Sequence, residues 1–353
     1  MKSVDDKQPF FDLYTEDDEE MEEMQRFNLE DVLGLARSFM ECRVFLSAAE
    51  LDLFTLLTPA PLSVPQVASR VGGDTRGLTI FLDALSAMGF LDKRGEVYQC
   101  SPSASRFLTA DAPGSVLPMV LHMAGLWRRW SDLTSIVLGA KVSDQITASF
   151  RDVDELHAFI EAMDVIAKPL APRMIEDVHP GPSRVLLDVG GASGTYTIAF
   201  LQTTPQMKAT LFDRPEVIEM ARQRLGKAGI LDRVRLVPGD FYRDQLPAGH
   251  DLAFISAIIH QNSPEQNVSL FLNVFQSLDP GGRVVIRDHV MEPNRIRPKD
   301  GALFAVNMLV STPAGGTYTY GEIKACLEQA GFIKVRLLQK GEDMDALVEA
   351  FKP

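Results

Sequence analysis

The stretch Asp188-Val189-Gly190-Gly191-Ala192-Ser193-Gly194 decides the fold, because it joins an apolar run to a helical pattern through a glycine-rich turn. Residues 185–187 are all apolar, as in the buried strands of parallel sheets. Glycine lets a backbone approach a ligand where a Cβ would clash. The glycines fall at 190, 191 and 194, which is not the G-x-G-x-x-G spacing of dinucleotide-binding proteins. The stretch therefore predicts a strand, a ligand-binding turn of another type, and a helix.

Further apolar runs follow the first and are separated by helical patterns: 209–213, 234–237, 252–255 and 283–286. This alternation predicts a doubly wound parallel sheet. Two late apolar runs, 333–338 and 346–351, have only a short turn between them and predict a closing antiparallel hairpin. We therefore expect an α/β, Rossmann-like domain over residues 179–353.

The first third of the chain has a different pattern. Helical spacing over 29–48, 63–68 and 78–88 is followed by alternating residues 90–99 around a glycine turn, which predicts three helices and a β-hairpin. Such a unit is a winged helix. Its third helix is apolar and has Asp83 where a DNA-reading helix would need Arg, Asn or Gln. We therefore expect residues 26–118 to be a winged-helix dimerisation domain and not a DNA-binding one.

Two more segments complete the predicted organisation. Residues 1–25 contain a run of acidic side chains and are expected to form a mobile tail. Residues 119–178 have helical spacing, which Pro169 and Pro172 are expected to break before the next domain. We expect this segment to be a helical linker that contributes to a ligand pocket between the two domains.

Composition limits the partners. Acidic residues outnumber basic ones, 48 to 35, and the net charge of −13 argues against nucleic-acid binding. The longest apolar run, 301–310, is too short to cross a bilayer, and the acidic N-terminus does not resemble a secretory signal. The three cysteines (Cys42, Cys100 and Cys326) are widely spaced without a metal-ligand pattern. We expect a cytoplasmic protein without a metal or a membrane partner.

Two aspartates follow successive predicted strands. Asp213 lies 23 residues after Gly190, where it could accept both hydroxyl groups of a ribose, and Asp240 could accept the exocyclic amine of adenine. Ligands of such sheets bind beyond the carboxyl ends of the strands. Together with the glycine turn, the two carboxylates predict an adenosine-containing ligand. The alternative is that both aspartates cap the helices that follow.

With these residues the chain resembles the small-molecule O-methyltransferases that include caffeate and hydroxyindole O-methyltransferases, over about residues 30–353. The matching stretches are Leu187–Gly191, Phe212–Ile218, Gly239–Phe241, His260, Asp279–Gly282, Ala330–Phe332 and Glu50–Phe54. The resemblance implies a class I methyltransferase domain, a homodimer, S-adenosylmethionine as cofactor and S-adenosylhomocysteine as product. It also implies a set of cofactor contacts: Gly190, Asp213, Asp240, Phe241 and Ser256, the last of which stands where relatives usually have a lysine.

The resemblance implies that His260 is the general base and that Asp288 orients it. A phenol with a pKa near 10 is a poor nucleophile until its proton is removed, and an imidazole with a pKa near 6.5 can remove it at neutral pH. The expected reaction is methyl transfer to a hydroxyl of a small aromatic acceptor. Judged without the resemblance, a lone histidine at a strand end is more often structural. His289, beside Asp288, is a reserve candidate.

Three positions depart from the family's pattern. Gln261 follows the histidine where an aspartate is usual, Ala192 replaces the third glycine of the turn, and Tyr318 takes the place of a second acidic residue. These departures keep C- or N-methylation, or another S-adenosylmethionine-dependent reaction, open as alternatives. A non-catalytic winged-helix regulator is a further alternative, which the acidic charge and the apolar third helix disfavour.

The acceptor pocket is expected between the two domains. Its predicted lining comes from the helical linker, from the late helical segment and from the loop before the last helix: Phe159, Met163, Met308 and Tyr318. Met and aromatic residues at helical spacing are more often plain core, and this alternative stays open.

Overall fold

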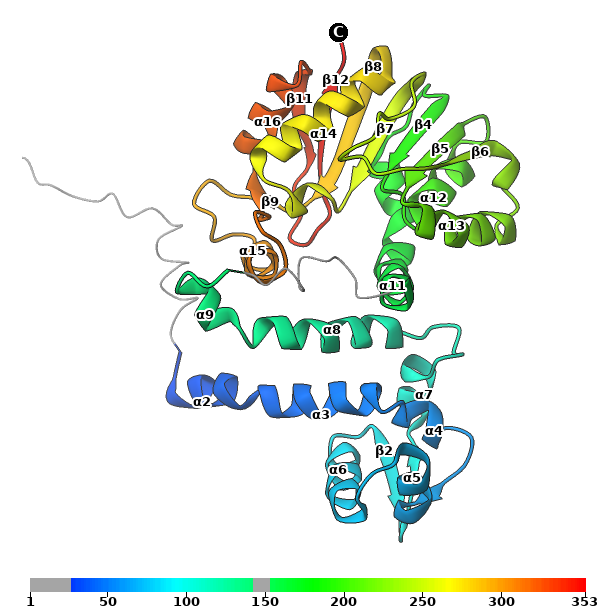
Figure 1. Cartoon of the computed structure of the whole chain (residues 1–353), viewed down its shortest axis with the longest axis vertical. Coiled ribbons are helices and arrows are strands. Elements are labelled where there is room, and N and C mark those ends of the chain that lie inside the picture. The colour runs from blue at the N-terminus through cyan, green and yellow to red at the C-terminus, as the bar shows by residue number, and fades with distance from the viewer. Residues whose placement is uncertain (1–26, 142–152) are drawn as a thin grey trace, which may run out of the picture.

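A computed structural model describes residues 27–141 and 153–353, except for the side chains of 153–155. The predicted acidic tail, residues 1–25, lies outside the described residues. Figure 1 shows a sheet flanked by helices at one end of the molecule, a small helical module at the other, and long helices between them. None of the described helices is both long and apolar enough to cross a lipid bilayer.

The large domain contains a seven-stranded sheet with the order β11-β12-β8-β7-β4-β5-β6. Its strands are β4 (Val185–Val189), β5 (Lys208–Asp213), β6 (Val234–Pro238), β7 (His250–Ser256), β8 (Leu278–Asp288), β11 (Ile333–Gln339) and β12 (Ala346–Phe351). Strands β4 to β8 pair in parallel, and β12 lies antiparallel to both β8 and β11. The predicted parallel sheet with a C-terminal antiparallel hairpin is confirmed. The strand order reverses between β4 and β7, which is where such sheets bind ligands.

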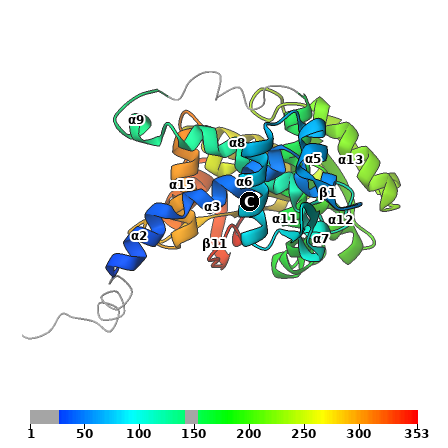
Figure 2. The same ribbon diagram turned by 90° about the horizontal axis from the view of Figure 1, so that it is seen from below.

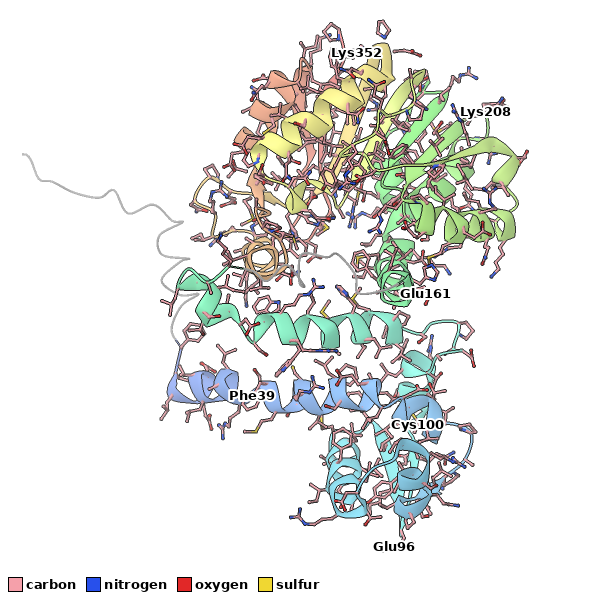
Figure 3. The ribbon with its side chains drawn as sticks, in the orientation of Figure 1. Phe39, Glu96, Cys100, Glu161, Lys208 and Lys352 are labelled. Carbon is pink, nitrogen blue, oxygen red and sulfur yellow. The ribbon has the colours of Figure 1, made fainter. Side chains whose placement is uncertain are left out.

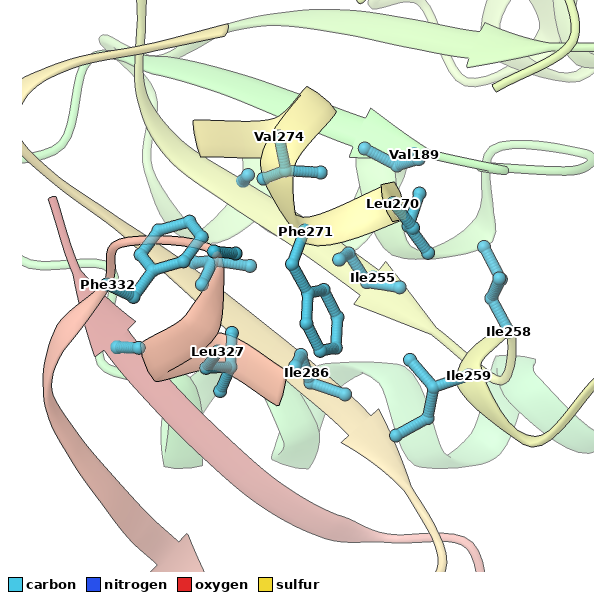
Figure 4. Packing of buried hydrophobic residues seen from close by; sticks show 14 of the residues in the cluster. Val189, Ile255, Ile258, Ile259, Leu270, Phe271, Val274, Ile286, Leu327 and Phe332 are labelled. Atoms are coloured by element: carbon cyan, nitrogen blue, oxygen red, sulfur yellow. The ribbon is translucent and has the colours of Figure 1, made fainter. Parts of the chain in front are cut away.

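Helices cover both faces of this sheet: α12 (Thr195–Thr203), α13 (Pro215–Lys227), α14 (Pro264–Ser277) and α16 (Tyr320–Gln329). On one face, Phe271 of α14 and Leu327 of α16 pack against Ile255 and Ile286 of the strands (Figure 4). On the other face, Phe200 of α12 packs in a second cluster with residues of β4, β5 and β7. A capping box, in which Ser263 and Gln266 exchange hydrogen bonds, begins α14.

The small module is the predicted winged helix. It contains α3 (Phe39–Glu50), α4 (Leu53–Leu57), β1 (Leu62–Ser63), α5 (Val64–Val71), α6 (Thr75–Ala87), β2 (Leu91–Arg94), β3 (Val97–Cys100) and α7 (Pro102–Leu108). Ser63 and Asp74 cap the starts of α5 and α6, as their sequence positions suggest. Leu78, Leu82 and Leu85 of α6 are buried inside the module. The apolar third helix therefore serves the module's own core.

A different part of the module exposes apolar side chains. Helix α2 (Leu29–Arg37) projects beyond the rest of the described chain in Figure 2, and Phe39 marks its junction with α3 in Figure 3. The exposed apolar residues here, which we call the α2–α3 face, are Phe27, Leu29, Val32, Leu33, Leu35, Phe39 and Met40. Exposed apolar side chains gathered on one segment are typical of an interaction surface.

Among the described residues, three helices connect the two domains: α8 (Leu117–Trp130), α9 (Leu133–Val137) and α11 (Val153–Val178). The predicted break at Pro169 and Pro172 is wrong, because α11 continues through both prolines. Both prolines are exposed, so water can solvate the carbonyl groups that lose a donor. The burial of Ile175 and Val178 holds the last turns of the helix in the sheet core.

The segment 119–178, predicted as one linker, is divided between the two cores. The start of α8, including Leu117 and Val120, packs with the winged helix. The end of α11 packs with the sheet. Between these ends lies α15 (Lys299–Ser311), which packs against α8. A hydrogen bond of 3.1 Å from Trp130 Nε1 to Asn307 Oδ1 joins α8 to α15. Helices α11 and α15 therefore lie between the sheet and α8 (Figure 1).

Candidate active site

The glycine turn between β4 and α12 lies directly on the neighbouring strand. Gly190 has φ +67°, and a Cβ added to Gly191 would lie 2.7 Å from Leu211 Cγ and 2.9 Å from the carboxylate of Asp188. Only glycine fits both positions without a shift of the sheet. Ala192, which replaces the third glycine, has φ +48° and so adopts the left-handed conformation despite its Cβ. The backbone path is therefore the one that the glycine pattern predicts.

Asp188, in strand β4, is hydrogen-bonded to helix α12 on the other side of the glycine turn. Its side chain is 2% exposed, and Thr197 Oγ1 donates a hydrogen bond of 2.6 Å to Oδ2. Burial raises the pKa of Asp188 to about 7, although the hydrogen bond from Thr197 opposes this rise. Asp188 thus ties the end of β4 to α12.

Asp213 lies at the end of β5 and faces the same turn. Its Oδ2 accepts from the backbone N–H of Ala192 and its Oδ1 from that of Arg214, both at 2.7 Å. Burial raises the pKa of Asp213, and these two N–H groups oppose that rise. Each carboxylate oxygen keeps a further lone pair. Asp213 therefore fits the predicted role of accepting hydrogen bonds from a ribose.

Asp240 and Phe241 follow β6 at the same edge. Asp240 Oδ1 accepts from the backbone N–H of Tyr242 at 3.0 Å, and Arg243 Nε lies 3.6 Å from its Oδ2. The ring of Phe241 lies beside Gly190, 3.5 Å from the position of an added Cβ. The glycine turn, Asp213 and Phe241 are thus brought together at this edge, and Asp240 directly precedes Phe241 in the chain. A contact of these residues with an adenosine stays a prediction.

Ser256, at the end of β7, accepts a hydrogen bond of 3.1 Å from Arg287 Nη1. Arg287 is 5% exposed, and its guanidinium lies 5.4 Å from the ring centre of Tyr196. A cation thus lies beside the position where the family resemblance implies a lysine. Sequence reasoning missed Arg287. The signal that could have found it is the parallel register that pairs Arg287 with Ser256.

His260 lies in the 3₁₀ helix η2 (Ile259–Gln261), directly after β7. Its Nδ1 is 2.9 Å from both carboxylate oxygens of Asp288, and the two side chains are buried. Burial alone would raise the pKa of Asp288. The charge and hydrogen bond of His260, with the backbone N–H of His289, outweigh burial and hold that pKa below its usual value. An ionised Asp288 accepts a hydrogen bond from the Nδ1–H group of His260, so the lone pair of the neutral imidazole is on Nε2.

An aromatic side chain packs against the histidine of this pair. The ring of Phe304, on α15, meets the His260 ring edge to face at 4.8 Å and lies 5.0 Å from the ring of His289. His289 is buried, burial lowers its pKa, and its Nδ1 has no hydrogen-bond partner among the described residues. Phe304 was also missed, because nothing in the sequence shows that α15 packs against η2.

The four residues that were predicted to line the acceptor pocket lie in different parts of the structure. Phe159 and Ala192 of the glycine turn both pack against a small apolar cluster of Leu156, Ile160 and Val217. Met163 lies one turn further along α11. Met308 is buried on α15. Tyr318 packs against Ile259 in the sheet core, and its hydroxyl donates to the carbonyl of Asn262. A contact between these four residues and an acceptor stays a prediction, and the visible role of Tyr318 is to support the loop around His260.

A polar bridge that the sequence did not suggest joins α11 to the glycine turn. Arg224 of α13 pairs with Asp164 of α11, with Nη2 2.6 Å from Oδ1, and also donates to Ser193 Oγ at 3.2 Å. Thr195 Oγ1 donates to the same carboxylate. Within the described residues, no group of three or more His, Cys, Asp or Glu could hold a metal ion.

Comparison with known proteins identifies this arrangement. Residues 136–333 match the O-methyltransferase domain and residues 33–110 match the O-methyltransferase dimerisation domain. The chain is 33% identical over 312 residues to the tetracenomycin polyketide synthesis 8-O-methyl transferase TcmO of Streptomyces glaucescens, covering 87% of this chain and 92% of that protein. It is 28% identical to acetylserotonin O-methyltransferase of Mus musculus, covering 90% of this chain and 87% of that protein.

Solved structures agree. The crystal structure of human N-acetylserotonin methyltransferase in complex with S-adenosylmethionine superposes with a TM-score of 0.77 at 25% identity, covering 93% of this chain and 99% of that one. PigF with S-adenosylhomocysteine has a TM-score of 0.81 at 24% identity, covering 92% and 100%, which shows the same fold. The chain therefore belongs to the family of S-adenosylmethionine-dependent O-methyltransferases.

Proposed function

We propose that this enzyme methylates a hydroxyl of a small aromatic acceptor, with His260 as general base and Asp288 as the residue that orients it. The observation that carries the proposal is the buried His260–Asp288 pair, with Nδ1 2.9 Å from both carboxylate oxygens. The pair follows β7 at the sheet edge that also holds the glycine turn. The residues expected to bind the methyl donor and the residues expected to act on the acceptor therefore lie at the same edge of the sheet.

The chemistry of the pair follows from its hydrogen bonding. S-adenosylmethionine supplies an electrophilic methyl group when bound. His260 Nε2 is the nitrogen that can take the hydroxyl proton, since Nδ1 donates to Asp288. The buried carboxylate stabilises the imidazolium that forms. General base catalysis typically contributes about 10² to 10⁴-fold to a rate.

The side chains around the pair favour an aromatic acceptor. Phe304 packs edge to face on His260, while Phe159 packs against the same small apolar cluster as Ala192 of the glycine turn. Apolar and aromatic linings with a few polar groups are typical of sites for small molecules. Two relatives are named for such acceptors, a 3-hydroxy-5-methyl-1-naphthoate 3-O-methyltransferase and the acetylserotonin enzyme.

We also propose that the enzyme is a homodimer. The dimerisation-domain match covers residues 33–110, and the α2–α3 face is exposed in the single chain. A second copy of the same face would remove these apolar side chains from water, as an isologous interface does. The exposed face is thus the best-supported contact surface.

The test of His260 uses purified enzyme, saturating donor and a panel of phenols. We expect His260→Ala to keep its affinity for S-adenosylhomocysteine and to lose at least about a hundredfold in kcat. Asp288→Asn should cost less, because the base itself remains. His289→Ala is the matched control, since His289 also contacts Phe304 but is not bonded to a carboxylate side chain.

Retention of activity within about fivefold in His260→Ala would leave only proximity as the source of catalysis. That result would favour C-methylation or another donor-dependent reaction, because a carbon acceptor does not need this base. A large loss confined to His289→Ala would move the role of base to His289.

A further inference from the structure

Arg287 is a buried cation without a counter-ion among the described residues. It is 5% exposed, and it forms no ion pair with any carboxylate of the described chain. Its Nε has no hydrogen-bond partner there either. Burial of a charge is costly unless the charge is paired and hydrogen-bonded. Another arginine of the same strand shows the usual solution, because Arg283 Nη1 lies 2.8 Å from the buried carboxylate of Glu349.

The neighbours of Arg287 are neutral and polar. Nη1 donates to Ser256 Oγ, and the guanidinium lies over the ring of Tyr196. Tyr196 Oη is itself buried and has no partner of acceptable geometry among the described residues. Two unsatisfied donors, Arg287 Nε and Tyr196 Oη, therefore occur in one small group. Such a group suits an anion with more than one oxygen.

Arg287, Tyr196 and Ser256 lie on the side of the site where the methyl donor is expected to bind. Tyr196 is in the first turn of α12, two residues after Gly194, so it directly follows the glycine turn. Ser256 ends β7, and the parallel register pairs it with Arg287 in β8. All three residues thus meet at the carboxyl edge of the sheet, near the strand-order reversal between β4 and β7.

We propose that Arg287, with Ser256 and Tyr196, anchors the carboxylate of the methionyl part of the donor. A guanidinium presents two parallel N–H donors that match a carboxylate, and its charge stays fixed at every working pH. The assignment rests on the donor occupying this edge, as the glycine turn and Asp213 indicate. Arg287 is then a positioning residue that holds the sulfur end of the donor toward His260.

The experiment measures binding without turnover. Wild type, Arg287→Met and Arg287→Lys are titrated by calorimetry with S-adenosylhomocysteine, which has the carboxylate, and with 5′-methylthioadenosine, which lacks it. We expect Arg287→Met to lose at least tenfold in affinity for S-adenosylhomocysteine and less than threefold for 5′-methylthioadenosine. Arg287→Lys, which keeps a charge, should recover part of the difference.

Arg283→Met is the matched control, because it removes a partly buried, ion-paired arginine four residues away on the same strand. It should lower thermal stability and leave the ratio of the two affinities unchanged. Equal losses for both ligands in Arg287→Met, or no loss for either, would overturn the proposal and leave Arg287 a structural cation. Neither result would affect the His260 test, because that test is made at saturating donor.

Discussion

The carboxyl group of Asp188 should make the stability of this enzyme fall as the pH rises. Burial raises the pKa of Asp188 from the ordinary value of 3.8 to about 7 in the folded chain. Between these values the unfolded chain ionises this group and the folded chain does not. The stabilisation is therefore fully present below pH 3.8 and is lost as the pH rises through 7. The range from pH 5 to pH 7 spans two pH units, which at about 1.36 kcal/mol per unit amounts to about 3 kcal/mol.

The perturbation is Asp188→Asn, which keeps the shape and still lets Thr197 Oγ1 donate to a side-chain oxygen. Urea unfolding followed by circular dichroism at pH 5 and pH 8 gives the free energy of unfolding of both proteins. Whatever the variant costs at pH 5, its stability relative to wild type should improve by about 3 kcal/mol at pH 8. Thr197→Val should extend the fall in stability to higher pH, because loss of the Thr197 hydrogen bond raises the pKa of Asp188 in the folded chain further. A relative change below about 1 kcal/mol, or one of opposite sign, would refute the reasoning.

Two further predictions concern the donor and the dimer. Asp213→Ala should weaken S-adenosylhomocysteine binding by at least about tenfold in calorimetry, because a charge-assisted hydrogen bond contributes about 1.5 to 3 kcal/mol, and wild-type affinity would disprove the ribose contact. Leu33→Asp with Phe39→Asp should convert a dimer to monomers in sedimentation, whereas Ile80→Asp, also exposed but on α6, should not. A wild-type protein that sediments as a monomer at micromolar concentration would contradict the proposed interface.

Sequence reasoning worked best where one strand or one turn carries the information. The glycine turn, Asp213 and Asp240 each follow an apolar run, and parallel strands bring their ends to one edge whatever the loops do. The pairing of His260 with Asp288 came from the family resemblance, and the structure places the two side chains 2.9 Å apart. These residues are positioned by regular elements, so their contacts follow from topology.

It worked less well where contacts depend on packing between distant elements. Proline lowers helix propensity, but α11 continues through Pro169 because the buried residues beyond it stabilise the helix more than the proline destabilises it. The apolar faces of α6 and α2 look alike in sequence, yet only that of α6 is covered by the rest of its module. Arg287 appeared as an ordinary charged strand residue, because its burial depends on the neighbouring strand and on α12.

The bridge from Asp164 through Arg224 to Ser193 has a thermodynamic consequence for catalysis. One end belongs to the helix that bears Phe159 and Met163, and the other belongs to the turn that receives the donor. If binding of the methyl donor reorients this bridge, it changes the affinity for the acceptor. Acceptor binding then changes the affinity for the donor by the same factor, because binding linkage is reciprocal. We therefore expect the dissociation constant of the acceptor to depend on whether S-adenosylhomocysteine is bound, and this dependence to shrink in Asp164→Asn.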